Sequence, residues 1–211
     1  MEALILYFVI FFPGIYSPAW LTEGGQLSSI PFSVYRELGR TLTYALPSLA
    51  LLLYIISDRK GLSGLKALNK RAIQPFLIAL PGLIIIGVSL SVLAGLFAGE
   101  TAPPRVEGPA NFSGWIVMVF SCLATGYLEE TYFRHYLLSS LKTAVPNTAV
   151  RILFSTALFA FCHMYEGPWA ILNAAFAGIL LSLLFIRFKS LHGLALAHAG
   201  YNIFVYTGIA G

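Results

Sequence analysis

Charged side chains are scarce in this sequence: Asp, Glu, Lys and Arg make up 10% of its 211 residues, against about 25% in an ordinary soluble domain. Hydrophobic residues make up 58%, and the mean hydropathy is +0.80. A water-soluble fold could not bury so much apolar surface without exposing large apolar patches. The composition therefore argues against a soluble protein and indicates that the solvent is lipid.

Cysteine is scarce as well. The sequence has two, Cys122 and Cys162, both inside apolar runs, which argues against a disulfide framework. We interpret each as a small packing residue.

The opening run MEALILYFVIFF lacks a basic region, so we expect a retained helix there rather than a signal peptide.

Long apolar runs are what the sequence has in abundance. A membrane-spanning helix needs about 20 mostly apolar residues, and seven candidate runs are present. They lie near 3–20, 41–57, 75–98, 114–141, 148–164, 168–187 and 191–209. We therefore expect an all-α fold: a polytopic transmembrane bundle of seven to eight helices, the eighth arising if the long fourth run divides. One domain over residues 1–211 is the simplest organisation.

Two local features predict how these helices bend and pack. Pro47 lies inside the second run and Pro81 inside the third, and each proline is expected to kink its helix. The pairs Ala174/Gly178 and Gly193/Ala197 have the small-xxx-small spacing that permits close helix contact in lipid.

Basic residues concentrate in alternate connections between the runs. The segment 58–73 carries five of them, and the connections after the fourth and sixth runs contribute Lys142, Arg151, Arg187 and Lys189. The positive-inside rule then predicts a multi-pass integral membrane protein with a cytoplasmic N-terminus and an exterior C-terminus. Basic residues in these connections account for the net charge of +4, so this charge does not indicate nucleic acid as a partner.

The fourth run contains a cluster of charges, and ionisable residues within spans usually mark function. The motif EETYFR begins at Glu129. Glu130 and Arg134 have the i, i+4 spacing of a favourable ion pair. Adjacent helical residues point about 100° apart, so Glu129 is predicted to lie on another face, available as a general base. The alternative is that the three charged side chains lie at a helix end, where they only pair with one another or extend to the membrane surface.

Two further polar pairs follow in later runs. Phe159 and His163 share a face at the end of the fifth run, and His198 and Asn202 share a face in the seventh. Each pair could instead be structural, the second through a hydrogen bond to a neighbouring helix. Asn173 in the sixth run also has two interpretations. It lines a cavity together with these polar residues, or it hydrogen-bonds to another helix.

Depth connects these residues. Counted from the basic end of each run at about 1.5 Å per residue, Glu129, His163 and His198 lie roughly 20, 18 and 13 Å into the bundle. Independent snorkelling does not require such agreement, so we expect the three helices to form one site.

The ordered set EExxxR, FxxxH and HxxxN on successive helices resembles the CPBP family: CAAX-prenyl proteases of the second type and bacteriocin-processing enzymes, also called Abi proteins. The resemblance covers about residues 113–205, and the first three runs carry no matching motif. It implies an intramembrane endopeptidase. Glu129 resembles the base that activates water, His163 its partner in orienting that water, and His198 and Asn202 the donors to the oxyanion.

The remaining motif residues have supporting roles in this scheme. Glu130 and Arg134 resemble residues that fix the helix and pocket, and Phe159 and Asn173 are expected in the substrate cavity. The expected partners are a peptide or lipidated-protein substrate and the membrane lipid.

A zinc site is the open alternative to a metal-free mechanism. Glu129, His163 and His198 could supply three ligands, but HExxH is absent and an Asn202 amide is a poor zinc ligand. We favour water activated by glutamate without a cofactor. Cys162 beside His163 is expected to point about 100° away from it, which argues against a thiol nucleophile.

Two other functions stay open on the residues alone. One is a non-enzymatic immunity or scaffold protein of the same fold, and the other is a transporter or proton-coupled channel, since intramembrane acids also mark ion paths. The lack of an inverted repeat argues against the transporter.

Overall fold

The computed structural model describes residues 2–15, 29–58, 70–97 and 105–208. Most of them are helical, and the described strands are a two-residue parallel pair, β1 (Ser29–Ile30) with β2 (Arg105–Val106). The predicted all-α membrane bundle is confirmed.

The described residues contain a helix at each of the seven predicted runs. In chain order the helical elements are α1 (Glu2–Ile15), α2 (Val34–Arg40), η1 (Thr41–Ala45), α3 (Leu46–Asp58), η3 (Lys70–Ala72), α4 (Ile73–Phe97), α5 (Phe112–Glu130), η5 (Thr131–Leu137), α6 (Leu138–Ser140), α7 (Thr148–Phe161), η6 (Met164–Glu166), α8 (Pro168–Phe188) and α9 (Leu191–Tyr206). Predicted positions 16–20, 98 and 209, and most of the basic segment 58–73, lie outside the described residues.

Consecutive elements join into long helices where the sequence is most apolar. Among the described residues, four continuous segments are long and apolar enough to cross a membrane: Val34–Asp58, Lys70–Phe97, Phe112–Ser140 and Pro168–Phe188. The fourth predicted run does not divide, because α5, η5 and α6 follow one another without a break.

The second helix begins earlier than the apolar run predicted. Ser33 caps its N-terminus by accepting a hydrogen bond from the backbone N–H of Arg36, and the charged residues of the first two turns pair with one another, so they do not stop the helix. A π turn at Thr41–Ala45 ends two residues before Pro47. Proline cannot make the regular i→i−4 bond, and the wider turn lies where that bond is lost.

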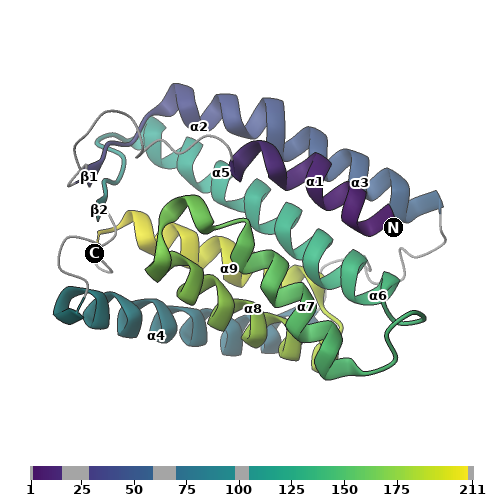
Figure 1. Cartoon of the computed structure of the whole chain (residues 1–211). Coiled ribbons are helices and arrows are strands. Elements are labelled where there is room, and N and C mark those ends of the chain that lie inside the picture. The colour runs from purple at the N-terminus through teal and green to yellow at the C-terminus, as the bar shows by residue number, and fades with distance from the viewer. Residues whose placement is uncertain (1, 16–28, 59–69, 98–104, 209–211) are drawn as a thin grey trace.

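The helices pack in a continuous order around α5 and α9. The segment α2–η1–α3 contacts α5, α5 contacts α9, α9 contacts α4, and α8 lies between α4 and α7. Figure 1 shows the N-terminus and α6 at one end of this bundle and the C-terminus with β1 and β2 at the other. The glycines in the predicted small pairs mark close approaches: a Cβ on Gly178 would lie 3.1 Å from the Thr156 side chain of α7, and one on Gly193 would meet the Ala72 carbonyl.

Basic residues gather at the end of the bundle that carries the N-terminus and α6, which we call the basic end. Burial and then the charges of Lys142 and Arg151 lower the pKa of Lys189, which follows α8. The connections after the fourth and sixth predicted runs therefore lie on one side, as the alternation requires. Which side of the membrane this is stays a prediction.

Candidate functional site

The charged motif lies where α5 changes its geometry. Glu129 and Glu130 are the last residues of α5, and the π-helical segment η5 follows directly. The predicted pair forms: Arg134 Nη1 is 3.2 Å from Glu130 Oε1, and both side chains are fully buried. Such π segments are rare in proteins, and those that occur are frequently found at functional sites. The apolar pattern did not predict this π segment.

Both glutamates reach the same imidazole. His198 Nδ1 is 2.9 Å from Glu130 Oε1, and His198 Nε2 is 3.5 Å from Glu129 Oε2. The expectation that helix phase separates the two carboxylates was therefore incomplete, because His198 lies between them and offers one nitrogen to each. An ionised carboxylate only accepts hydrogen bonds, so Nδ1–H of His198 donates to Glu130 in this arrangement.

A glycine sets the distance between the two helices that carry these residues. A Cβ on Gly126, one turn before Glu130, would lie 2.9 Å from the Ala195 carbonyl oxygen and 3.1 Å from the Ala199 N. Those atoms belong to the backbone of α9 on either side of His198, so a side chain at this position would force the helices apart. Small residues at such crossings let helices approach closely in lipid.

Phe159 connects the second motif to the first. Its ring is 2% exposed and lies 4.8 Å from the His163 ring and 5.9 Å from the His198 ring. The Arg134 guanidinium lies 4.4 Å from the ring centroid, within cation–π range. Phe159 therefore packs against residues of all three motifs. A direct part in the substrate cavity stays a prediction.

His163 lies just beyond the end of α7, which ends at Phe161. Its Nδ1 is 2.8 Å from the Phe159 carbonyl oxygen and 3.4 Å from the Cys162 Sγ. The expectation that Cys162 points away from His163 was wrong, because the 100° rule holds only inside a helix and these residues have left it. The Cys162 thiol is buried and also donates to the Phe159 carbonyl.

The two asparagines have different surroundings. Asn202 lies one turn after His198 on α9 and is half-buried, and the described residues give its amide no hydrogen bond. Asn173 on α8 donates to the Tyr201 hydroxyl of α9 at 3.0 Å. This is the interhelical bond that was the alternative interpretation of Asn173, and its presence in the substrate cavity stays a prediction.

The first helix supports the site in a way that no motif indicated. The fully buried Tyr7 donates from its hydroxyl to the Leu158 carbonyl near the end of α7. Tyr132 in η5 donates to the Ala3 carbonyl at 2.6 Å, and Phe133 packs 5.1 Å from Phe159. Helix α1 thus ties η5 to the turn that carries the FxxxH histidine.

A second polar cluster inside a spanning helix was also not predicted from the sequence. Glu37 of α2 is 4% exposed; its carboxylate accepts hydrogen bonds from Arg40 at 3.0 Å and from the Ser121 hydroxyl of α5 at 2.9 Å. Arg40 also donates to Ser121. The second predicted run starts near residue 41 and so leaves these charges outside the helix. The i, i+3 spacing of Glu37 and Arg40 was the signal in the sequence that could have indicated the pair.

The described part of the chain does not present a ready metal site. Within it, no group of three His, Cys, Asp or Glu side chains is arranged to hold a metal ion. Glu129 and His198 face each other, and the Nδ1 of His163 is directed to the Phe159 carbonyl, which leaves its Nε2 as the nitrogen for other contacts. A mechanism without a metal therefore stays a prediction, with the three-ligand zinc site as its alternative.

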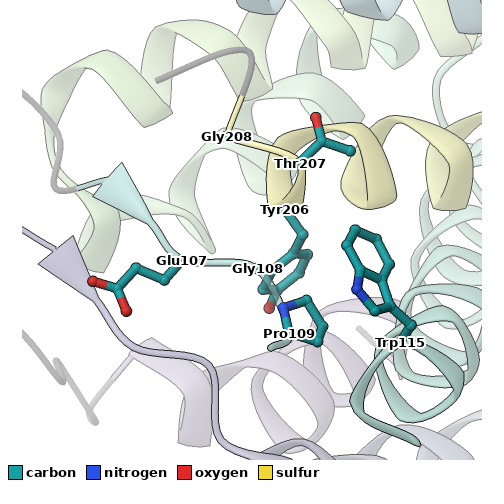
Figure 2. A pocket seen from close by; sticks show the side chains of 7 residues that line it. All are labelled: Glu107, Gly108, Pro109, Trp115, Tyr206, Thr207 and Gly208. Carbon is teal, nitrogen blue, oxygen red and sulfur yellow. The ribbon is translucent and has the colours of Figure 1, made fainter. Parts of the chain in front are cut away.

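One surface hollow lies at the other end of the bundle from the basic residues. It has a volume of about 390 Å³ and is lined by Glu107, Gly108, Pro109, Trp115, Tyr206, Thr207 and Gly208. Figure 2 shows the rings of Trp115 and Tyr206 near each other, with Glu107 pointing away from them. None of the predicted site residues lines it.

These observations define a class: an integral membrane helical protein with a buried glutamate–histidine site where α5, α7 and α9 meet. The family model described as type II CAAX prenyl endopeptidase Rce1-like matches residues 111–204. The resemblance drawn from the motifs is thereby confirmed over this segment. Neither the curated proteins nor the solved structures gave a match. The family supports a protease of the CAAX-endopeptidase kind in general.

Proposed function

We propose that this protein is an intramembrane endopeptidase that hydrolyses a peptide bond with water activated by Glu129. The observation that carries the proposal is the convergence of two carboxylates on His198, with Glu130 buried against Arg134 and Glu129 facing the second imidazole nitrogen. The Glu130–Arg134 pair neutralises its own charge, which leaves the Glu129 carboxylate as the basic group. The Rce1-like domain supports the same reaction class.

The reaction needs a base for water and donors for the oxyanion. Glu129 takes a proton from water as the water oxygen bonds to the scissile carbonyl carbon. The carbonyl electron pair moves to oxygen and forms a tetrahedral oxyanion. As the oxyanion collapses, the C–N bond breaks, and Glu129 returns the proton to the departing amine. A carboxylic acid and an amine result, and the enzyme is unchanged.

His198 and Asn202 are the proposed oxyanion donors. With Nδ1–H of His198 donating to Glu130, donation from Nε2 requires the imidazolium form. Because Glu130 is already paired with Arg134, the Glu129 carboxylate at 3.5 Å from Nε2 compensates that positive charge, which otherwise would be costly in a buried site. The Asn202 amide lies one turn away and needs no change of charge to donate. His163 is the proposed partner that orients the attacking water.

The substrate is proposed to be a peptide near the membrane surface, with or without a prenyl group. The test is cleavage by the purified protein of a farnesylated CAAX peptide and of the same peptide without the lipid, each with and without a metal chelator. We expect the farnesylated peptide to be cut and the chelator to have no effect. Equal cleavage of both peptides would show that the prenyl group is not needed. Inhibition by chelator would overturn the metal-free mechanism, and cleavage of neither peptide would contradict a CAAX-type activity.

A further inference from the structure

A second surface hollow lies at the basic end of the bundle, away from the proposed active site. Its volume is about 380 Å³, and it is lined by Lys70, Arg71, Gln74, Arg187 and Phe188. The first three residues belong to η3 and the first turn of α4, and the last two end α8. The hollow is therefore built between the ends of two helices that are both candidate membrane spans.

The lining has one sign of charge. Three of its five side chains are cationic, and no carboxylate is among them. The Gln74 amide adds a hydrogen-bond donor, and Phe188 gives the hollow an apolar wall over which the Arg187 guanidinium lies, 5.6 Å from the ring centroid. An arginine held in this way presents its planar N–H groups in a fixed direction, which suits the oxygens of a phosphate.

The surroundings add to the positive field. Lys189 directly follows Phe188, and its pKa is lowered by burial and by the neighbouring charges of Lys142 and Arg151. So many like charges at one end of a small bundle repel one another. An anion in the hollow would relieve that repulsion, and it would do so without affecting the ion pairs of the active site.

The position of the hollow indicates where the anion comes from. Arg187 is in the last turn of the span Pro168–Phe188, and Lys70 begins the span Lys70–Phe97. Helix ends of this kind lie at the level of the lipid headgroups. Basic pockets between transmembrane helices at this level suit anionic headgroups.

We propose that this hollow binds the phosphate of an anionic phospholipid headgroup, with Lys70 and Arg187 contacting the phosphate from two helices. A bound lipid would hold the start of α4 to the end of α8, next to the connection that leads into α9 and His198.

The test compares ligand binding to the detergent-purified protein by native mass spectrometry. The ligands are short-chain phosphatidylglycerol, short-chain phosphatidylcholine and inorganic phosphate. The test variant combines Lys70→Gln with Arg187→Gln. The matched control combines Lys142→Gln with Lys189→Gln, which removes the same charge from the same end of the bundle outside the hollow.

We expect phosphatidylglycerol to bind wild type and control with affinities within twofold of each other, and to bind the test variant about 30-fold more weakly, or ~2 kcal/mol for two basic residues. Equal loss in both variants would overturn a specific site. Equal binding of phosphatidylcholine would overturn the requirement for an anionic headgroup, and displacement of the lipid by inorganic phosphate would point to a soluble anion as the natural ligand.

A melting experiment on the wild-type protein keeps the proposal testable if the test variant does not fold. Phosphatidylglycerol should raise the melting temperature more than phosphatidylcholine does at equal concentration, because a ligand that binds the folded state stabilises it. The same shift with both lipids would contradict the proposal.

Discussion

Replacing Arg134 by methionine should cost more stability than any other single change near the site. The guanidinium is fully buried, 3.2 Å from Glu130 and 4.4 Å from the Phe159 ring centroid. Removing it leaves a buried carboxylate without its cation, a loss of about 3–5 kcal/mol for pairs of this kind. For a chain of this length, ~1 kcal/mol shifts the melting temperature by roughly 2–4 °C, so the expected decrease is about 6–20 °C.

The matched control is Arg36→Met. Arg36 also sits beside a glutamate, but its side chain is 44% exposed and 3.7 Å from Glu37, and exposed pairs contribute about 0–1 kcal/mol. Thermal melting of both variants in the same detergent, followed by intrinsic fluorescence, measures the difference. We expect the Arg36 variant to melt within about 4 °C of wild type.

A double variant distinguishes loss of the ion pair from simple loss of packing. Combining Glu130→Gln with Arg134→Met removes both charges, so the buried carboxylate that makes the single change costly is gone. The double variant should therefore melt at a higher temperature than Arg134→Met alone. A double variant that is the less stable of the two, or an Arg134 variant as stable as the Arg36 control, would refute the buried-pair reasoning.

Three further changes test how the site is assembled. Gly126→Ala should lower both the melting temperature and the rate of cleavage, because a Cβ there would lie 2.9 Å from the α9 backbone; wild-type behaviour in both assays would show that the close approach is unimportant. Tyr7→Phe removes the hydroxyl that donates to Leu158 and should cost about 1 kcal/mol of unfolding free energy, measured by denaturant titration; no loss would remove α1 from the support of the site. Asn202→Ala should lower kcat by about 10²–10³ with an unchanged melting temperature, whereas an effect on KM alone would contradict a role in the transition state.

The helices could be predicted from the sequence because lipid imposes a simple requirement on length and composition. Each apolar run became a helix at nearly its predicted bounds. The largest error was the start of the second helix, since Glu37 and Arg40 look like loop residues until they are seen to pair with each other and with Ser121. A pairing across helices leaves no periodic pattern in one stretch of sequence.

The residues of the site could be predicted from the sequence better than the contacts between them. Helix phase predicted the Glu130–Arg134 pair, and the common depth predicted that α5, α7 and α9 meet. Neither helix phase nor depth could reveal that His198 offers one nitrogen to each glutamate, because that contact depends on how two helices pack. The Cys162–His163 contact was missed for a simpler reason: the helix ends at Phe161, so helical angles no longer apply.

The central claim is that Glu129 activates the attacking water, and one comparison tests it most directly. Peptide cleavage is measured with Glu129→Gln, which keeps the shape of the side chain, and with Cys162→Ala, which removes the thiol 3.4 Å from His163. We predict that the Glu129 variant folds and loses cleavage by at least about 100-fold, while the Cys162 variant stays active. Full activity of the Glu129 variant, or loss of activity in a folded Cys162 variant, would contradict the claim.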